Sequence, residues 1–136
     1  MADDFLARGF TYFDTSYVYH GGKSEDALRQ ALVERHPRES FTITTKLPVF
    51  LLKERTDTRR FFAEQLARLG TDYVDYYWLH ALNAASYENA VRLGVFEEVA
   101  QLKKEGRIHH MAATAVLLII AVLILKPSEK DAQIIR

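Results

Sequence analysis

The sequence predicts an α/β fold in which parallel strands alternate with helices. Short runs rich in β-branched and aromatic residues alternate with segments whose apolar residues recur at helical spacing. Residues 73–79 are apolar on both faces except at Asp75, which is typical of a parallel strand covered by helices. The chain has 136 residues and 49% of them are apolar, which is enough for one ordinary domain with a sizeable core.

Four strands are expected along the chain. Each run is bounded by turn-forming residues, and Pro48 stops the second because proline interrupts a strand's hydrogen bonds. The first strand follows Gly9 and ends near Thr15. The expected strands are residues 10–13, 41–45, 73–79 and 108–111.

Three helical segments separate these strands. Ser24 is the expected N-cap of the first, and Pro37 ends it because the residue before proline leaves the α region. Gly70 stands where a glycine commonly follows the last turn of a helix. Gly94 is expected to interrupt the third segment. The helices are expected over residues 24–36, 56–69 and 86–104.

Charge and composition exclude several classes of function. Lysine plus arginine equals aspartate plus glutamate, 18 against 18, whereas a nucleic-acid binder would carry a basic excess. The absence of cysteine excludes disulfides, thiolate metal sites and cysteine nucleophiles. No histidine has metal-ligand spacing to a partner, so no metal site is expected. These features are compatible with the cytoplasm, which is the expected location.

Polar residues stand at the ends of three consecutive predicted strands. Asp14, Lys46 and His80 each lie at the carboxyl end of a different strand, and Tyr19 lies in the loop after the first. Ligands of parallel α/β folds bind at that edge of the sheet. We therefore expect these four side chains to converge on one functional site.

The four residues suit acid catalysis at a carbonyl. A tyrosine hydroxyl has an ordinary pKa of about 10, and a nearby ammonium such as Lys46 would lower it by favouring the phenolate. Asp14 would hold Lys46 in place, while His80 would bind the substrate oxygen or relay the proton. Such a group suits carbonyl protonation while a cofactor delivers hydride. His20 adjoins Tyr19 and is a candidate for substrate binding.

At these residues the sequence resembles the aldo-keto reductase superfamily. Residues 13–19, FDTSYVY, are similar to its F-D-T-A-x-x-Y motif, and residues 22–25, GKSE, to the G-x-S-E that follows. Residues 44–46, TTK, match the strand with the catalytic lysine, and residues 78–80, WLH, the strand with the histidine. The resemblance covers about residues 5–111. It is nearest to a microbial branch whose longer members append an iron–sulfur segment.

The resemblance implies a (β/α)₈ TIM barrel and reversible, NADPH- or NADH-dependent reduction of a small carbonyl compound to an alcohol. Tyr19 would be the general acid and Lys46 the group that lowers its pKa. Asp14 would support Lys46, and His80 would orient the substrate. The branch's cluster cysteines are absent, so no iron–sulfur cluster is expected.

The chain is expected to hold only part of that barrel. A complete one needs about 250 residues, and residues 1–111 match strands two to five. After the fifth strand the family usually continues Gly-Phe-Ser, whereas residues 112–114 are AAT here. The loops that bind cofactor phosphates have no match, so no cofactor-binding residue is assigned. Residues 112–136 are expected to be a divergent apolar segment followed by a polar tail.

Residues 111–125 are apolar except for Thr114, and three structures fit them. They are one or two buried strands, a buried or partner-binding helix, or a short membrane segment. A helix of this length spans about 22 Å against a hydrocarbon core of about 30 Å, so the length disfavours the membrane segment. A partial barrel also exposes apolar sheet surface, so self-association is expected.

Two other functions stay open beside the oxidoreductase. The chain would be either a catalytically inactive remnant or a subunit that must assemble, and both would keep the four-residue geometry without turnover. A membrane-associated fragment is the less favoured third reading, and it rests on residues 111–125 alone.

Overall fold

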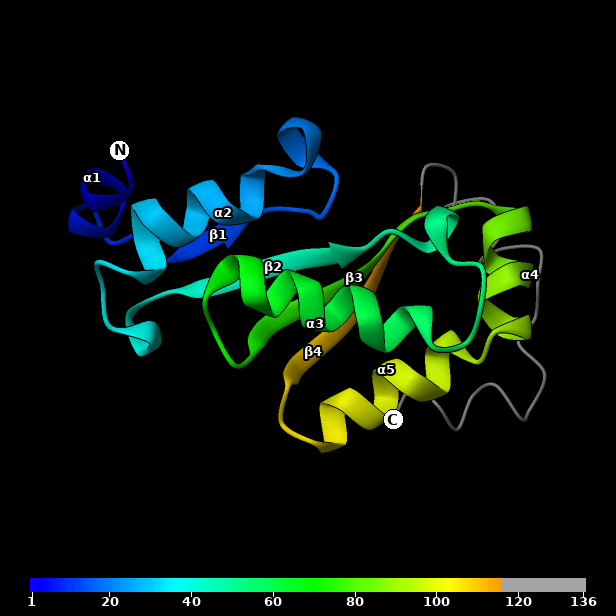
Figure 1. The fold of residues 1–136 in the computed structure, drawn as a ribbon. Coiled ribbons are helices and arrows are strands. Elements are labelled where there is room, and N and C mark those ends of the chain that lie inside the picture. Colours follow the sequence, from blue (N-terminus) through cyan, green and yellow to red (C-terminus); the bar gives the residue numbers. More distant parts are fainter. Residues whose placement is uncertain (116–136) are drawn as a thin grey trace.

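The computed structural model describes residues 1–115, which form a four-stranded parallel sheet with helices packed on it (Figure 1). The strands follow the chain in the order β1-β2-β3-β4, and every neighbouring pair is parallel. Their bounds are β1 Tyr12–Asp14, β2 Thr42–Leu47, β3 Val74–Leu82 and β4 Ile108–Ala115. Parallel neighbours need a crossover connection, and helical segments supply it between each pair. The predicted α/β class is confirmed.

Helices α2, α3 and α5 lie along one side of the sheet in Figure 1. A short helix, α1, precedes β1 and is not expected from the sequence. The helix expected before Pro37 begins as α2 and continues as the single π-helical turn η2. The bounds are α1 Ala2–Ala7, α2 Ser24–Leu28, η2 Arg29–Val33, α3 Asp57–Leu69, α4 Ala84–Arg92 and α5 Val95–Lys104, with 3₁₀ turns η1 Tyr19–Gly22, η3 Arg38–Ser40 and η4 Val49–Leu51.

The predicted N-cap at Ser24 is wrong. Lys23 occupies the cap position, Ser24 is the first helical residue, and no side chain caps this helix. The Ser24 hydroxyl instead accepts a hydrogen bond of 2.9 Å from the Thr15 hydroxyl. This contact ties the beginning of α2 to the segment that follows β1.

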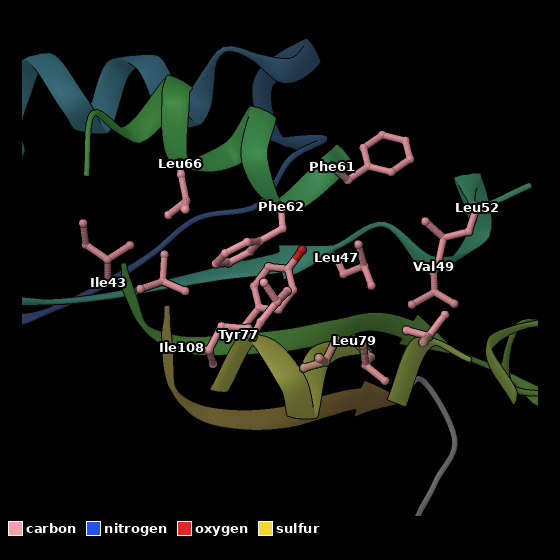
Figure 2. Close-up of a cluster of buried hydrophobic side chains, with 14 of the residues drawn as sticks. Ile43, Leu47, Val49, Leu52, Phe61, Phe62, Leu66, Tyr77, Leu79 and Ile108 are labelled. Carbon is pink, nitrogen blue, oxygen red and sulfur yellow. The ribbon is translucent and has the colours of Figure 1, made fainter. Parts of the chain in front are cut away.

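The core lies between the sheet and the helices on it (Figure 2). Ile43 and Leu47 on β2, Tyr77 on β3 and Phe62 on α3 are buried there, and the Tyr77 and Phe62 rings meet edge to face at 5.0 Å. Successive strand residues point to opposite faces of a sheet. Lys46 therefore projects from the face opposite this core.

A left-handed glycine ends α3, and its replacement tests how tightly the helix end packs. Gly70 has φ 66°, and an added Cβ would lie 3.0 Å from Cδ of Arg29. We expect Gly70→Ala to lower the free energy of unfolding by about 1–2 kcal/mol in urea titration. Gly106 has φ 73° with nothing within 4 Å of its Cβ position, so Gly106→Ala should cost less. Equal losses would mean that the Arg29 side chain moves aside freely.

The described helices leave the second face of the sheet without a covering layer. Tyr12 is 44% exposed there, and β1 and β4 are the outer strands of the described sheet. Self-association of the chain stays a prediction, and dimers or larger species are expected in sedimentation as concentration rises. Monomers at every concentration would contradict it.

Residues 116–136 lie outside the described part of the chain, and most of the predicted apolar segment lies there. Its first residues, 111–115, belong to β4, which is longer than expected. No helix within residues 1–115 is long and apolar enough to cross a membrane. The domain boundary at residue 111 and the three structures proposed for residues 116–125 stay predictions.

Candidate active site

The four predicted site residues meet at the carboxyl end of the sheet. Asp14 is the last residue of β1, Lys46 lies next to the end of β2, and His80 lies near the end of β3. Tyr19 begins the turn η1 that follows β1. The structure therefore brings together side chains that lie up to 66 positions apart in the sequence, from Asp14 to His80.

Lys46 is the centre of this group. Its ammonium donates to Asp14 Oδ1 at 2.6 Å, to the Thr15 carbonyl at 2.9 Å and to the Tyr19 hydroxyl oxygen at 3.2 Å. Its side chain is only 4% exposed, so these acceptors replace the water lost on burial. An ammonium has three hydrogens, and all three are used. Lys46 is therefore held as a charged group against Tyr19.

The backbone of Lys46 is supported from the core side of the sheet. β1 ends opposite Thr44, so β1 supplies no ladder partner for Lys46. The buried amide of Gln65 on α3 donates to the Lys46 carbonyl at 3.1 Å. Gln65 in turn accepts from the Tyr77 hydroxyl at 2.7 Å and donates to Glu25 at 2.9 Å. The Gln65 side chain thus supplies the hydrogen bond to the Lys46 carbonyl that a longer β1 would have made.

Glu25 is fully buried beside this support. Burial raises the pKa of its carboxyl group, while hydrogen bonds from Thr45 and Gln65 partly oppose that effect. Its second oxygen lies 3.5 Å from Arg68 Nη1 and has no hydrogen-bond partner among the described residues. Sequence reasoning missed Gln65, although a signal exists: it is a polar residue at helical spacing from the buried Phe61.

His80 faces Tyr19 across the site. The Tyr19 and His80 rings meet edge to face with centroids 5.8 Å apart. The centroid of the Phe50 ring lies 6.0 Å from that of His80. His80 Nδ1 is 3.1 Å from the hydroxyl oxygen of Ser16, a fully buried residue that sequence reasoning did not assign to the site. Burial and then the charge of Lys46 lower the pKa of His80, which favours a neutral ring at neutral pH.

A bulge follows His80 and sets where β3 places it. The pairing of β3 with β4 shifts between Leu79 and Leu82, and Ala81 has φ 52°, which is rare for a residue other than glycine. The Ala81 amide donates to Thr114 Oγ1 at 3.0 Å, and that hydroxyl donates to the Leu79 carbonyl at 3.3 Å. Bulges beside functional sites redirect a side chain. No sequence pattern signals this one.

The lowered pKa of His80 predicts a pH dependence of stability. As pH falls below the ordinary histidine value of 6.5, the unfolded chain binds a proton at His80 before the folded chain does. The stability that His80 contributes is therefore fully present above pH 6.5. It is lost as the pH falls from 6.5 through the lowered pKa of His80 in the folded chain. We expect His80 to titrate below 6.5 by NMR, and His80→Gln to flatten urea stability over this window. A His80 titration above 6.5 would contradict this expectation.

His20 is not drawn into the group. It is exposed, has φ 52°, and its side chain forms no hydrogen bond within residues 1–115. Its assignment to substrate binding stays a prediction. The same part of the chain contains no group of three or more histidine and acidic side chains arranged to hold a metal ion.

Comparison with known proteins identifies the family. The sequence model of the Aldo/keto reductase family matches residues 1–119. The chain belongs to this family. Aldo/keto reductase membership agrees with the motif resemblance around Asp14 and Lys46, and it was predicted from those residues.

Similar proteins include enzymes and solved structures. A Saccharomyces cerevisiae protein named glycerol 2-dehydrogenase (NADP(+)) is 34% identical over 76 residues, which is 55% of this chain and 22% of that protein. The holo form of aldo-keto reductase AKR11C1 from Bacillus halodurans is 26% identical with a TM-score of 0.70, covering 94% of this chain and 42% of that one. An aldo/keto reductase of Brucella melitensis is 26% identical with a TM-score of 0.67, covering 90% and 46%.

These similarities define the architecture. The four parallel strands and their helices are part of an aldo/keto reductase barrel, which confirms the predicted partial (β/α)₈ fold. The chain spans less than half the length of each relative named above.

Proposed function

We propose that this chain carries out NAD(P)H-dependent reduction of a small carbonyl compound and the reverse oxidation of the alcohol, with Tyr19 as general acid. The hydrogen bond from Lys46 to Tyr19 carries the proposal. Because the Tyr19 oxygen accepts from the ammonium, the hydroxyl hydrogen is not used in that contact. Tyr19 is 37% exposed, so a substrate oxygen can reach this hydrogen.

Each neighbour supports the transfer of that proton. The positive charge of Lys46 stabilises the negative charge that develops on the Tyr19 oxygen as the proton leaves. Asp14, at 2.6 Å from the ammonium, holds Lys46 in place against Tyr19. The neutral ring of His80 lies across from Tyr19, where it would hydrogen-bond the same substrate oxygen.

The reacting end of a nicotinamide cofactor fits the donor set at this edge of the sheet. The group there supplies a proton to a carbonyl oxygen, and a bound nicotinamide would supply the hydride to the carbonyl carbon. The name of the yeast relative includes NADP(+) and an alcohol substrate, which supports this pairing. All three hydrogens of Lys46 are used, so this lysine is not available to bind the cofactor's phosphates. No residue is assigned to them.

Cofactor binding and turnover test the proposal directly. Titration with NADPH should change the fluorescence of the nicotinamide, and a panel of small aldehydes and ketones should then oxidise the bound cofactor. The expected dissociation constant is about 1 mM or lower, in the range of ordinary enzyme substrates. Absence of binding at about 1 mM would rule out catalysis by this chain alone. It would favour a catalytically inactive remnant or a subunit that must assemble.

A further inference from the structure

We propose that Ser16 is a positioning residue that holds His80 in the tautomer with its hydrogen on Nε2. The inference rests on the proposed function, because it assigns His80 the role of a hydrogen-bond donor to the substrate oxygen. It adds a residue outside the four that the motifs identify. Ser16 stands where the family motif F-D-T-A-x-x-Y has alanine, so the hydroxyl is a departure from that motif.

The contact itself is well isolated. Ser16 is fully buried, and its hydroxyl oxygen lies 3.1 Å from Nδ1 of His80. Within residues 1–115 the hydroxyl has no other hydrogen-bond partner. The Ser16 carbonyl accepts from the backbone amide of Tyr19 at 3.1 Å. Ser16 thus contacts both proposed donors to the substrate: the ring of His80 through its hydroxyl, and the backbone of Tyr19 through its carbonyl.

The burial of Ser16 decides which atom donates. If His80 Nδ1 carried the hydrogen and donated to Ser16, the serine hydrogen would be buried without an acceptor. Leaving a buried donor unsatisfied costs about 1–3 kcal/mol. If the Ser16 hydroxyl donates to Nδ1, its hydrogen is satisfied and only lone pairs are left. The second arrangement is therefore favoured, and Nδ1 is the acceptor.

Burial, and after it the positive charge of Lys46, lower the pKa of His80, whereas Asp14 acts in the opposite sense. A neutral ring is therefore favoured at neutral pH, and a neutral ring exists as one of two tautomers. A neutral imidazole carries one hydrogen. With Nδ1 accepting from Ser16, that hydrogen lies on Nε2, the ring nitrogen left for the substrate.

This tautomer completes the site for a carbonyl oxygen. The Nε2 hydrogen of His80 and the hydroxyl hydrogen of Tyr19 then serve as two donors to one acceptor atom. In the other tautomer Nε2 would present a lone pair to the substrate oxygen, and the two would repel. The Ser16 hydroxyl therefore acts on the substrate through His80 without touching it.

Nitrogen NMR of the full chain labelled with ¹⁵N-histidine measures the tautomer without cofactor or turnover. In the wild-type protein at neutral pH, we expect Nδ1 of His80 to give the resonance of an unprotonated nitrogen and Nε2 that of a protonated one. Ser16→Ala should shift both resonances toward a mixture of tautomers. Thr58→Val removes another fully buried hydroxyl, one that has no hydrogen-bond partner in the described part of the chain, and should leave both resonances unchanged.

Kinetics provide the second arm. Ser16→Ala should reduce kcat by about three- to tenfold, the equivalent of one hydrogen bond, and Ser16→Thr should recover part of the loss. A wild-type ring protonated on Nδ1 would overturn the inference even if no variant folds, and so would an unchanged tautomer in Ser16→Ala. Absence of wild-type turnover would instead reject the proposed function, and the NMR result would still decide the role of Ser16.

Discussion

Tyr19→Phe is expected to reduce kcat for carbonyl reduction by about 10²- to 10⁴-fold, the usual contribution of a positioned acid. The ring keeps its edge-to-face contact with His80 and its place 4.6 Å from the Lys46 ammonium. Only the hydroxyl is removed, and with it the proton that the substrate oxygen receives. NADPH affinity should change little, because the hydroxyl is not needed to bind the cofactor. Steady-state rates and a binding titration measure the two quantities separately.

Tyr12→Phe is the matched control. Tyr12 lies on β1 and is also partly exposed, but its hydroxyl accepts from Thr44, whereas the Lys46 ammonium donates to Asp14, the Thr15 carbonyl and Tyr19. This variant should keep kcat within about twofold, as expected for a change remote from the reacting atoms. If Tyr19→Phe retained wild-type turnover while Tyr12→Phe lost it, the assignment of the acid would be wrong.

Arg38→Met is expected to lower the free energy of unfolding by about 3 kcal/mol, because it removes the guanidinium that pairs with the shielded Asp75 carboxylate and leaves that carboxylate only the Ile43 amide and the His109 ring as polar neighbours. The guanidinium donates to Asp75 Oδ2 at 2.6 Å, to Thr71 at 3.1 Å and to the Phe41 carbonyl at 3.0 Å. It also stacks 4.0 Å from the ring centroid of Tyr73. Arg38 thus joins β2 and β3 at the end opposite the candidate site. Urea unfolding with a fixed slope measures the loss.

Arg35→Met provides the comparison for that loss. Arg35 pairs with Asp3 at 2.7 Å, but both side chains are about half exposed. Exposed ion pairs contribute about 0–1 kcal/mol, so this variant should be nearly neutral. A similar loss in both variants would mean that shielding of the Arg38–Asp75 pair does not matter. A loss confined to Arg38→Met would show that the shielded Arg38–Asp75 pair stabilises the fold more than the exposed Arg35–Asp3 pair does.

Much of the fold and of the candidate site follows from local sequence patterns. Short apolar runs and the turn residues after them predict that strands end close to Asp14, Lys46 and His80, and the structure places these residues at or near the ends of β1, β2 and β3. Gly70 ends α3 in the left-handed conformation, as its position predicts. The side chains then converge because parallel strands place their carboxyl ends at one edge of the sheet. Tyr19 meets Lys46 because the turn η1 follows β1 at that same edge.

Other features could not be predicted because they depend on which distant segments become neighbours. Asp75 is an acidic residue in an otherwise apolar strand, and its partner Arg38 is distant in the sequence. Ser24 is a typical helix N-cap residue, but its hydroxyl accepts a hydrogen bond from Thr15 instead. The bulge at Ala81 depends on Thr114 from β4. Local propensities carry no information about these contacts.

The family, the parallel α/β class and the four side chains that meet at the carboxyl edge can all be predicted from the amino-acid sequence. Periodicity and strand ends are local properties, and a parallel sheet converts them into one site. Three further features come from the folded arrangement: Lys46 uses every hydrogen of its ammonium, Gln65 bonds the Lys46 carbonyl where β1 supplies no partner, and Ser16 contacts His80. Those features depend on distances of about 3 Å between atoms from different elements, which packing sets.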